Sequence, residues 1–330
     1  MKIILLASLA LAASAASASA ITITTPANGA QVTSPFNLIA STATCNSKPA
    51  VSMGYSIDYG VTSIVSTSFS SLVLAGNGPH ILHVKCWGTN GAAGDTDLNI
   101  TVVPTPSVPQ TIIGSVQKLS GWTWTHDPGT GGSSVGSSSI VASPSLSGAA
   151  RQFSMSFSDY GGEIYHTSFA ADPTATHFIY DAQLWISNPS TVANIEMDLN
   201  QVIANGDTVI YGVQCDGWSG TWDYTVNNGT PTAPIDSWIH TNVPCPEPKT
   251  WAANTWHHVQ IAYFRDALGN VTYQSVVLDG ALSEFTGATG SSAFSLGWGP
   301  TLLTNFQLDG LSPNSGSVTA YLDNVTISLW

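Results

Sequence analysis

The central segment of this sequence is Asn194-Ile195-Glu196-Met197-Asp198-Leu199-Asn200-Gln201. Apolar and polar residues alternate strictly along it, with Ile195, Met197 and Leu199 on one side and Glu196, Asp198 and Asn200 on the other. Because successive side chains of a strand point to opposite faces, this alternation predicts a half-buried β-strand. The two carboxyl groups would lie about 6–7 Å apart. At least one is then expected to have a raised pKa, unless a cation or a hydrogen-bond donor lies nearby.

The composition around this strand favours an all-β protein with a neutral partner. Hydrophobic residues make up 43% of the 330 residues and charged residues only 8%, and glycine and proline recur as turns between short strands would require. The net charge of −13 argues against nucleic acid and anionic membranes, because both need clustered Lys and Arg. No later apolar run reaches the ~20 residues of a membrane span, and no nucleotide-binding phosphate loop occurs. Low charge with many aromatic, Ser, Thr and Asn residues suits a neutral polymer better.

The first twenty residues predict export. Lys2 is followed by an apolar core from Ile3 to Ala13, and Ala18-Ser19-Ala20 is a small-x-small cleavage site. This order is typical of a secretory signal peptide, predicted here over residues 1–20. The predicted location is secreted or extracellular, with the periplasm and the cell surface as alternatives.

The cysteines predict two disulfides. An even number of cysteines in an exported protein implies disulfide pairing, and the four are Cys45, Cys86, Cys215 and Cys245. Four cysteines allow three pairings. Because two lie in each half of the chain, we expect Cys45–Cys86 and Cys215–Cys245.

The remaining chain divides into two β-rich segments. Strand and turn signals alternate over residues 21–103 and again over residues 111–330. Between them, residues 104–110 contain three prolines in seven residues, a composition that favours an extended, semi-rigid linker. We therefore predict two domains, each an antiparallel β-sandwich.

The first segment resembles the bacterial immunoglobulin-like modules of secreted proteins. Two stretches carry the resemblance, Ile23-Thr24-Thr25-Pro26-Ala27-Asn28-Gly29-Ala30 and Gly78-Pro79-His80-Ile81-Leu82-His83-Val84-Lys85-Cys86. The resemblance implies an immunoglobulin-like β-sandwich over residues 21–103. We expect it to act as a spacer or an adhesive support.

The second segment resembles the concanavalin A-like lectin and glucanase superfamily. Thr255-Trp256-His257-His258-Val259-Gln260-Ile261 and the turn Val277-Leu278-Asp279-Gly280 are similar to laminin-G-like modules, as is the last strand, Ala320-Tyr321-Leu322-Asp323-Asn324-Val325. The resemblance implies a jelly-roll β-sandwich over residues 111–330 that engages polysaccharide. It also allows a structural calcium ion, with Asp323 as the candidate ligand, and no other cofactor.

Within that superfamily, residues 196–201 resemble the catalytic strand of family 16 and family 7 glycoside hydrolases. The pattern of that strand is Glu-x-Asp-x-Glu or Glu-x-Asp-x-x-Glu. The resemblance implies that Glu196 is the nucleophile and Asp198 its assistant. The acid/base position holds Asn200 or Gln201, and an amide cannot protonate a leaving group. A carboxyl group from a neighbouring strand would have to substitute, and the candidates are Glu163 and Asp216.

Tryptophans supply a second set of candidate binding residues. Trp218, Trp222 and Trp238 lie inside the loop that a Cys215–Cys245 disulfide would close. Indole faces stack on the apolar faces of sugars. Packing in the core is the alternative for each of them. Asn200 and His258 complete the predicted carbohydrate-binding residues.

These observations leave three hypotheses open. The first is a secreted polysaccharide-binding protein that does not hydrolyse its ligand, because the acid/base Glu is replaced. The second is an active glycan-degrading enzyme, a glycoside hydrolase or a polysaccharide lyase, that uses Glu196 and Asp198. The third is a structural or adhesive cell-surface protein, in which the two carboxylates only form a polar strand face.

Overall fold

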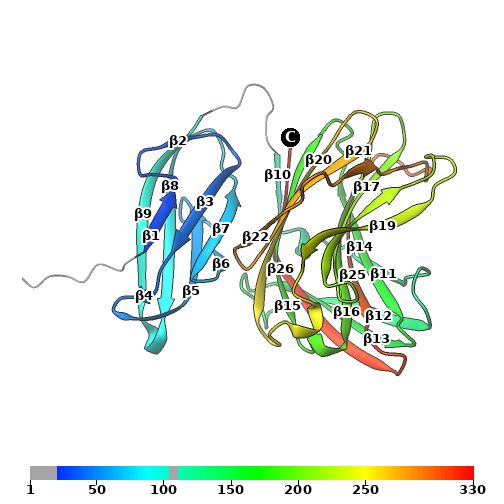
Figure 1. Ribbon diagram of the computed structural model, residues 1–330, viewed down its shortest axis with the longest axis horizontal. Helices are drawn as coiled ribbons and strands as arrows, with labels where there is room; N and C mark the ends of the chain where they lie inside the picture. Colours follow the sequence, from blue (N-terminus) through cyan, green and yellow to red (C-terminus); the bar gives the residue numbers. More distant parts are fainter. Residues whose placement is uncertain (1–20, 104–110) are drawn as a thin grey trace, which may run out of the picture.

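A computed structural model describes residues 21–103 and 111–330 and is all-β, as predicted. The predicted signal peptide and linker lie outside the described residues, and so does the predicted boundary at 104–110. The described residues form two β-sandwiches side by side (Figure 1). Each sandwich has its own hydrophobic cluster of buried side chains, so each sequence segment builds a separate core.

The first sandwich packs a three-stranded sheet against a six-stranded one. The small sheet has the order β1-β3-β7 and the larger one the order β2-β9-β8-β5-β4, with β6 beside β5. The strands are β1 (Thr22–Thr25), β2 (Gln31–Val32), β3 (Phe36–Ser41), β4 (Thr44–Cys45), β5 (Lys48–Ile57), β6 (Ser63–Val65), β7 (Ser68–Val73), β8 (Gly78–Gly88) and β9 (Ala93–Val102). The predicted sandwich is present, whereas its assignment to the immunoglobulin-like family stays a prediction.

The second sandwich stacks two large antiparallel sheets, as expected for a jelly roll. We call the sheet farther from the first sandwich the front sheet and the nearer one the back sheet (Figure 1). The front sheet has the order β11-β14-β25-β16-β17-β18-β19, with β24 beside β17. Its strands are β11 (Thr123–His126), β14 (Gly162–Ala170), β16 (Val192–Val202), β17 (Thr208–Asp216), β18 (Thr221–Asn227), β19 (Asp236–Pro244), β24 (Ala293–Phe294) and β25 (Leu302–Gly310). The central strand, β16, contains the alternating stretch 194–201.

The back sheet has the order β12-β13-β26-β15-β20-β21-β22, with β10 beside β26 and β23 beside β21. Its strands are β10 (Thr111–Gly114), β12 (Ser133–Val141), β13 (Ala150–Ser158), β15 (His177–Ile186), β20 (Trp256–Arg265), β21 (Asn270–Leu278), β22 (Ala281–Glu284), β23 (Thr289–Ser291) and β26 (Gly316–Leu329). Four short 3-10 helices join strands, at Thr89–Gly91, Val116–Lys118, Pro189–Thr191 and Pro248–Thr250. No helix in the described part of the chain is long and apolar enough to cross a membrane.

Both predicted disulfides are present. Cys45 is bonded to Cys86 with their Cα atoms 5.8 Å apart, and Cys215 is bonded to Cys245 at 5.7 Å. Each bond lies within one sandwich, so no disulfide joins the two. Such bonds persist in oxidising compartments outside the cytoplasm.

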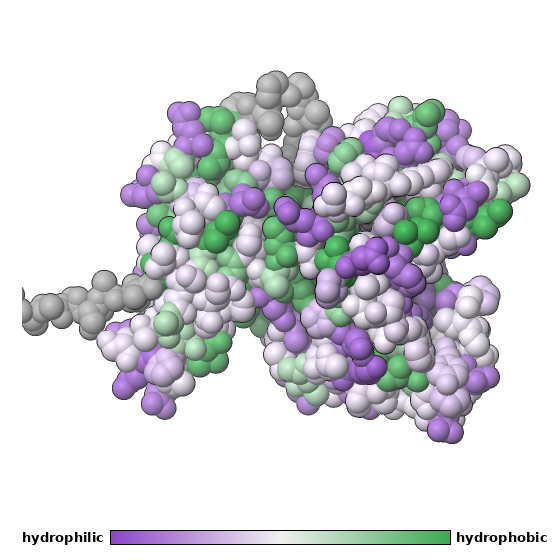
Figure 2. All heavy atoms as spheres, in the orientation of Figure 1, coloured by the Kyte–Doolittle hydropathy of each residue, from purple (hydrophilic) through white to green (hydrophobic). Residues whose placement is uncertain are grey.

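The outer face of the back sheet packs against the first sandwich. Leu72 N donates to Gln260 Oε1 at 3.1 Å, and Gln260 Nε2 donates to Leu72 O at 2.7 Å. Ser70 N also donates to Gly280 O at 2.7 Å. Figure 2 shows the two bodies in contact along this boundary. The front sheet therefore keeps its outer face turned away from the first sandwich (Figure 1).

Candidate functional site

Polar side chains form rows across the outer face of the front sheet, with β16 in the middle. On β16, Ile195, Met197 and Leu199 point into the core, so Glu196, Asp198 and Asn200 occupy the opposite face, as predicted. Gln307 of β25 and Gln214 of β17 lie opposite Glu196, and Asn305 and Gly212 lie opposite Asp198, as the strand register shows. The pairing thus surrounds the two carboxyl groups mainly with amides.

The polar side chains of β16 are buried, and burial governs the ionisation of the two carboxyl groups. Glu196, Asp198 and Asn200 are between 2% and 9% exposed. Burial and then repulsion from Asp198 raise the pKa of Glu196 well above its ordinary value. Burial raises the pKa of Asp198 to about 7, although hydrogen bonds with Glu196 and Asn305 oppose the shift. Both effects favour the protonated form of Glu196, which can donate a hydrogen bond.

Two buried oxygens of this face lack a hydrogen-bond partner in the part of the chain that the structure describes. Asp198 Oδ1 and Asn200 Oδ1 have no hydrogen-bond partner among the described residues. Glycine at position 212 leaves room beside Asp198, because a Cβ atom there would stand 3.1 Å from Asp198 Oδ1 and 2.7 Å from Thr225 Cγ2. A buried polar atom without a partner is unfavourable, so both oxygens favour a hydroxyl donor.

Two further carboxyl groups share this face, and only one of them was a candidate from sequence. Asp309 of β25 follows Gln307 by two residues, and burial raises its pKa to about 7. Asp216 of β17 accepts hydrogen bonds from the backbone N–H groups of Trp218 and Ser219, at 2.9 and 3.1 Å. Alternation in Gln307-Leu308-Asp309 is the sequence signal that could have identified Asp309.

Glu163 cannot supply the missing acid/base group. It lies opposite Leu308, whose side chain points into the core, so it occupies the other face of the front sheet from Glu196. Its Oε2 accepts a hydrogen bond from Ser134 Oγ of the back sheet. The expectation that it might substitute from a neighbouring strand is therefore wrong, because the register places it on the wrong side.

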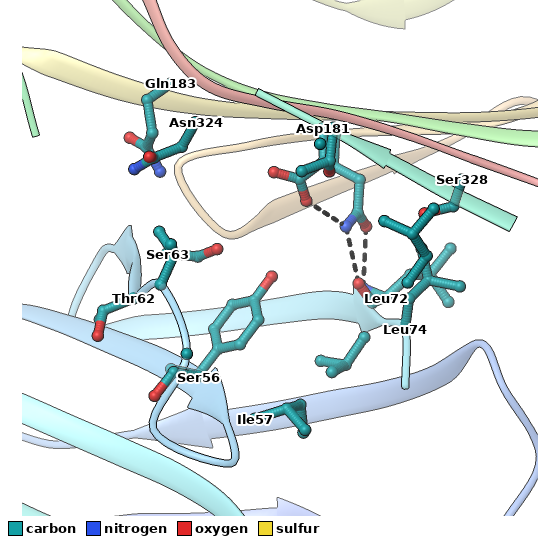
Figure 3. Close-up of a pocket in the computed structure, with 18 of the residues that line it drawn as sticks. Ser56, Ile57, Thr62, Ser63, Leu72, Leu74, Asp181, Gln183, Asn324 and Ser328 are labelled. Atoms are coloured by element: carbon teal, nitrogen blue, oxygen red, sulfur yellow. Dashed lines mark hydrogen bonds between the residues drawn. The ribbon is translucent and has the colours of Figure 1, made fainter. Parts of the chain in front are cut away.

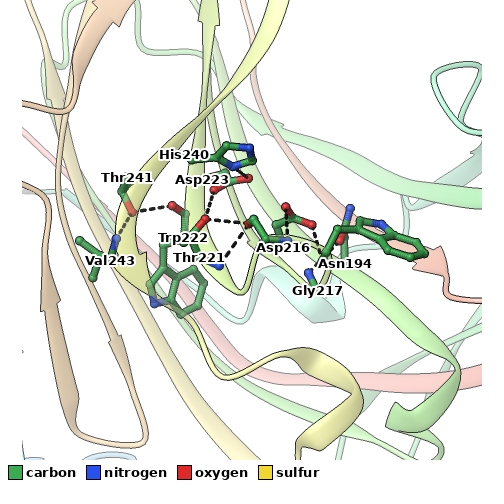
Figure 4. Close-up of polar contacts among 11 residues, drawn as sticks. Asn194, Asp216, Gly217, Thr221, Trp222, Asp223, His240, Thr241 and Val243 are labelled. Atoms are coloured by element: carbon green, nitrogen blue, oxygen red, sulfur yellow. Dashed lines mark hydrogen bonds and ion pairs between the residues drawn. The ribbon is translucent and has the colours of Figure 1, made fainter.

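Asp216 belongs to a cluster at one end of the same face. One ligand atom from each of Asp216, Asp223 and His240 lies within 4.8 Å of the others. His240 Nδ1 is 2.8 Å from Asp223 Oδ2, and Thr221 Oγ1 donates to Asp223 Oδ1 at 2.7 Å (Figure 4). The hydrogen bond with Asp223 raises the pKa of His240. Such donors suit a divalent cation, but each carboxylate already has hydrogen-bond partners.

The predicted tryptophan platform is only partly available. Trp218 is 60% exposed in the turn after β17, with its ring edge-on to Tyr160 at 5.8 Å. Trp238 is partly exposed and lies opposite Thr225, on the outer face. Trp222 is 1% exposed and packs in the core, so its assignment to sugar binding is corrected. Trp222 belongs to β18, where it alternates with outward-facing Asp223.

His258 is also placed away from this face. It belongs to β20 of the back sheet and is fully buried, with its ring edge-on to Tyr55 of the first sandwich at 6.4 Å. Its Nε2 lies 3.1 Å from Asp181 Oδ1. Burial opposes the charged ring, but Asp181 outweighs burial and raises the pKa of His258. The prediction that His258 binds the same carbohydrate as Asn200 is therefore corrected.

Asp323 does not fit the predicted calcium ion. Its Oδ2 accepts hydrogen bonds from Ser145 Oγ, Leu146 N and Ser147 N at 2.6–2.9 Å, and its Oδ1 accepts from Ser147 Oγ and Gln117 Nε2 at 2.6 and 3.1 Å. These donors lower its pKa even though burial opposes the shift. Asp323 fastens the loop before β13 to β26, and N–H donors stand where a cation would need oxygen ligands.

Comparisons with known proteins give likeness of fold at low identity. No family model matches the sequence, and no curated protein matches it. A solved structure described as showing the promiscuous specificity of carbohydrate-binding modules from the beta-sandwich superfamily has 8% identity and a TM-score of 0.36, over 94% of this chain and 98% of that chain. A Bacillus licheniformis beta-glucanase has 10% identity and a TM-score of 0.33, over 68% and 98%.

A third structure is the family 11 carbohydrate-binding module of a cellulosomal cellulase of Clostridium thermocellum. It has 11% identity and a TM-score of 0.31, over 67% of this chain and 95% of that chain. Likeness at this level carries no argument about function. The function is therefore argued from the outer face of the front sheet.

Proposed function

We propose that the protein binds a neutral polysaccharide on the outer face of the front sheet and does not hydrolyse it. One observation carries the proposal: two buried oxygens, on Asp198 and Asn200, lack partners in the middle of a face built from amides and carboxyl groups. Such groups form the hydrogen bonds that sugar hydroxyls require. Burial raises the pKa of Glu196 and so favours its protonated form, which would offer a donor without a charge.

Aromatic rings extend the proposed site past the end of β17. Trp218 is exposed there and Trp238 is partly exposed on the outer face. Stacking of a sugar on either ring buries apolar C–H groups at a small cost in side-chain entropy. The proposed ligand therefore runs from the carboxyl groups of β16 toward Trp218, which suits a chain of sugars better than a single one.

The absence of hydrolysis is proposed from the chemistry of one position. A retaining hydrolase needs a nucleophile and a second carboxyl group that protonates the leaving oxygen. On the strand itself that position holds Asn200, and an amide has no proton to give. Glu196 would also have to be ionised to act as the nucleophile, whereas burial and Asp198 favour its protonated form.

A hydrolase remains the second candidate because of Asp309. This carboxyl group lies on the same face as Glu196, on the adjacent strand β25, and has a pKa of about 7. A carboxylic acid with a pKa near neutrality is suited to general acid catalysis. In this alternative Asp309 protonates the leaving group and Glu196 attacks, with Asp198 beside it.

Export also belongs to the proposal. Two disulfides support a compartment outside the cytoplasm, and the apolar N-terminus after Lys2 supports secretion. The first sandwich would then position the second one without touching the polysaccharide on the front sheet.

Substitution of Trp218 tests the proposed face. Trp218→Ala is expected to weaken binding of a retained polysaccharide by ~1–3 kcal/mol, with little change in the thermal midpoint, because the ring is exposed. Trp124→Ala is the matched control, since Trp124 is also exposed but lies opposite Tyr165, away from the outer face. Affinity electrophoresis against soluble glucans, xylans and mannans measures the change. Equal effects of the two substitutions would contradict the proposed location.

A further inference from the structure

A cavity of about 360 Å³ lies where the two sandwiches meet (Figure 3). Its walls come from both bodies, with Tyr55, Ser63 and Leu72 on one side and Asp181 and Gln183 on the other. The latter two belong to β15 of the back sheet, so the core of the second sandwich separates this cavity from the outer face of the front sheet. It is therefore a different site from the one proposed for polysaccharide.

Gln183 is the buried amide of this cavity that has no hydrogen-bond partner within the described chain. Its side chain is 2% exposed, and neither Nε2 nor Oε1 has a hydrogen-bond partner among the described residues. Figure 3 shows it beside Asn324, with Thr62 and Ser63 of the first sandwich on the opposite wall. A buried amide without partners is unfavourable, so this position favours a ligand that both donates and accepts.

Two neighbouring polar side chains, Gln260 and Asp181, are already paired, whereas Ser56 Oγ of the lining also lacks a partner among the described residues. Gln260 Nε2 donates to Asp181 Oδ2 at 2.8 Å and to Leu72 O at 2.7 Å. Asp181 Oδ1 lies 3.1 Å from His258 Nε2. These contacts hold the two sandwiches together beside the cavity. Because they fix both walls, the space in front of Gln183 is a built pocket and not a loose seam.

The lining selects the chemistry of the ligand. No Lys or Arg lies among the described residues that line the cavity, and its one carboxylate is Asp181, so the lining itself disfavours an anion. The Lys85 ammonium group stands behind the wall and donates to Thr62 Oγ1 at 2.7 Å. Hydroxyl groups line it at Ser63 and Ser328, and Ile57 and Leu72 contribute apolar surface. Apolar walls with a few polar groups, at a junction between two bodies and with a volume of roughly 300–1000 Å³, are typical of small-ligand sites.

We propose that this junction cavity binds a small neutral polyol of the size of one or two sugar units, with the Gln183 amide as the recognising group. The amide accepts from one ligand hydroxyl and donates to another. Ile57 and Leu72 cover the apolar side of the ligand. Because the ligand contacts both sandwiches, its binding stabilises their contact, and this inference does not depend on the function proposed for the front sheet.

Titration calorimetry of the full chain tests the proposal with cellobiose and methyl β-glucoside as neutral probes and glucuronate as the charged one. Gln183→Met keeps the length of the side chain and removes the amide. We expect saturable binding of at least one neutral probe, weakened about tenfold or more in Gln183→Met, a change of at least about 1.4 kcal/mol. Gln152→Met on β13, outside the cavity lining, is the matched control and should bind as the wild type does.

Two further measurements keep the test decisive. Val61 is 67% exposed at the cavity, so Val61→Trp should obstruct it without a folding cost and abolish binding. Without sugar, Gln183→Met should melt no lower than the wild type, since it removes an unpaired buried amide. Absence of saturable binding of both neutral probes would overturn the proposal, as would equally tight binding of glucuronate. Binding retained in Gln183→Met but lost in Trp218→Ala would do the same, because it would place the sugar on the front sheet.

Discussion

Replacement of Asp198 by asparagine should remove a carboxyl group whose ionisation opposes folding. Asp198 is buried, and its pKa is raised from an ordinary 3.8 to about 7. Between about pH 4 and pH 7 the folded protein therefore binds more protons at this site than the unfolded chain does. Because of that difference, the free energy of unfolding falls as the pH rises through this window. Asparagine does not ionise, so the substitution should remove this part of the fall.

The pKa values set the size of the effect. A rise from 3.8 to about 7 is about three pH units, and each unit corresponds to ~1.4 kcal/mol. Above pH 7 the ionisation of Asp198 should thus lower the free energy of unfolding of the wild type by on the order of 4 kcal/mol relative to low pH. We expect Asp198→Asn to be close to the wild type near pH 4 and more stable than it near pH 8, by up to about 4 kcal/mol.

Urea unfolding monitored by tryptophan fluorescence near pH 4, pH 6 and pH 8 measures this difference. Asp159→Asn is the matched control, because Asp159 is exposed and its left-handed backbone suits asparagine equally well. The control should follow the wild type at every pH. If Asp198→Asn loses stability between the lowest and the highest pH as steeply as the wild type does, burial does not govern this carboxyl group and the electrostatic account of β16 is wrong.

Two further predictions concern packing. Trp222→Ala should lower the free energy of unfolding by ~3–5 kcal/mol, as removal of a buried aromatic ring does, and a denaturation curve would show it; a loss below 1 kcal/mol would place the ring outside the core. Gln260→Ala should remove both hydrogen bonds to Leu72 and speed hydrogen exchange at the Leu72 amide, and unchanged exchange would contradict the contact between the sandwiches.

Local alternation allowed the central strand to be predicted, because a period of two is a property of neighbouring residues. It correctly separates Ile195 from Glu196 on β16, and the same argument applied to 221–227 would have placed Trp222 inward and Asp223 outward. The position of Trp222 between Cys215 and Cys245 suggests a binding loop, although the residues around Trp222 alternate as a strand does.

Contacts between distant parts of the chain decide the placements that the sequence could not predict. Alternation assigns His258 and Val259 to opposite faces of β20, but it cannot tell that the first sandwich covers the face of His258. Likewise, the strand around Asp309 could be read from sequence, whereas its place beside β16 depends on a pairing more than a hundred residues distant in the chain. Glu163 shows the same limit, since only the register of β14 places it on the wrong face.

We propose above that the outer face of the front sheet retains a neutral glycan without cutting it. The most direct test incubates one soluble β-glucan with the wild type and with Glu196→Gln, and measures retention and released reducing ends in the same samples. We expect retention by both proteins, with affinities within about tenfold of each other, and product from neither. Product released by the wild type and abolished in Glu196→Gln would contradict it and establish a hydrolase, with Asp309 as the first acid to examine.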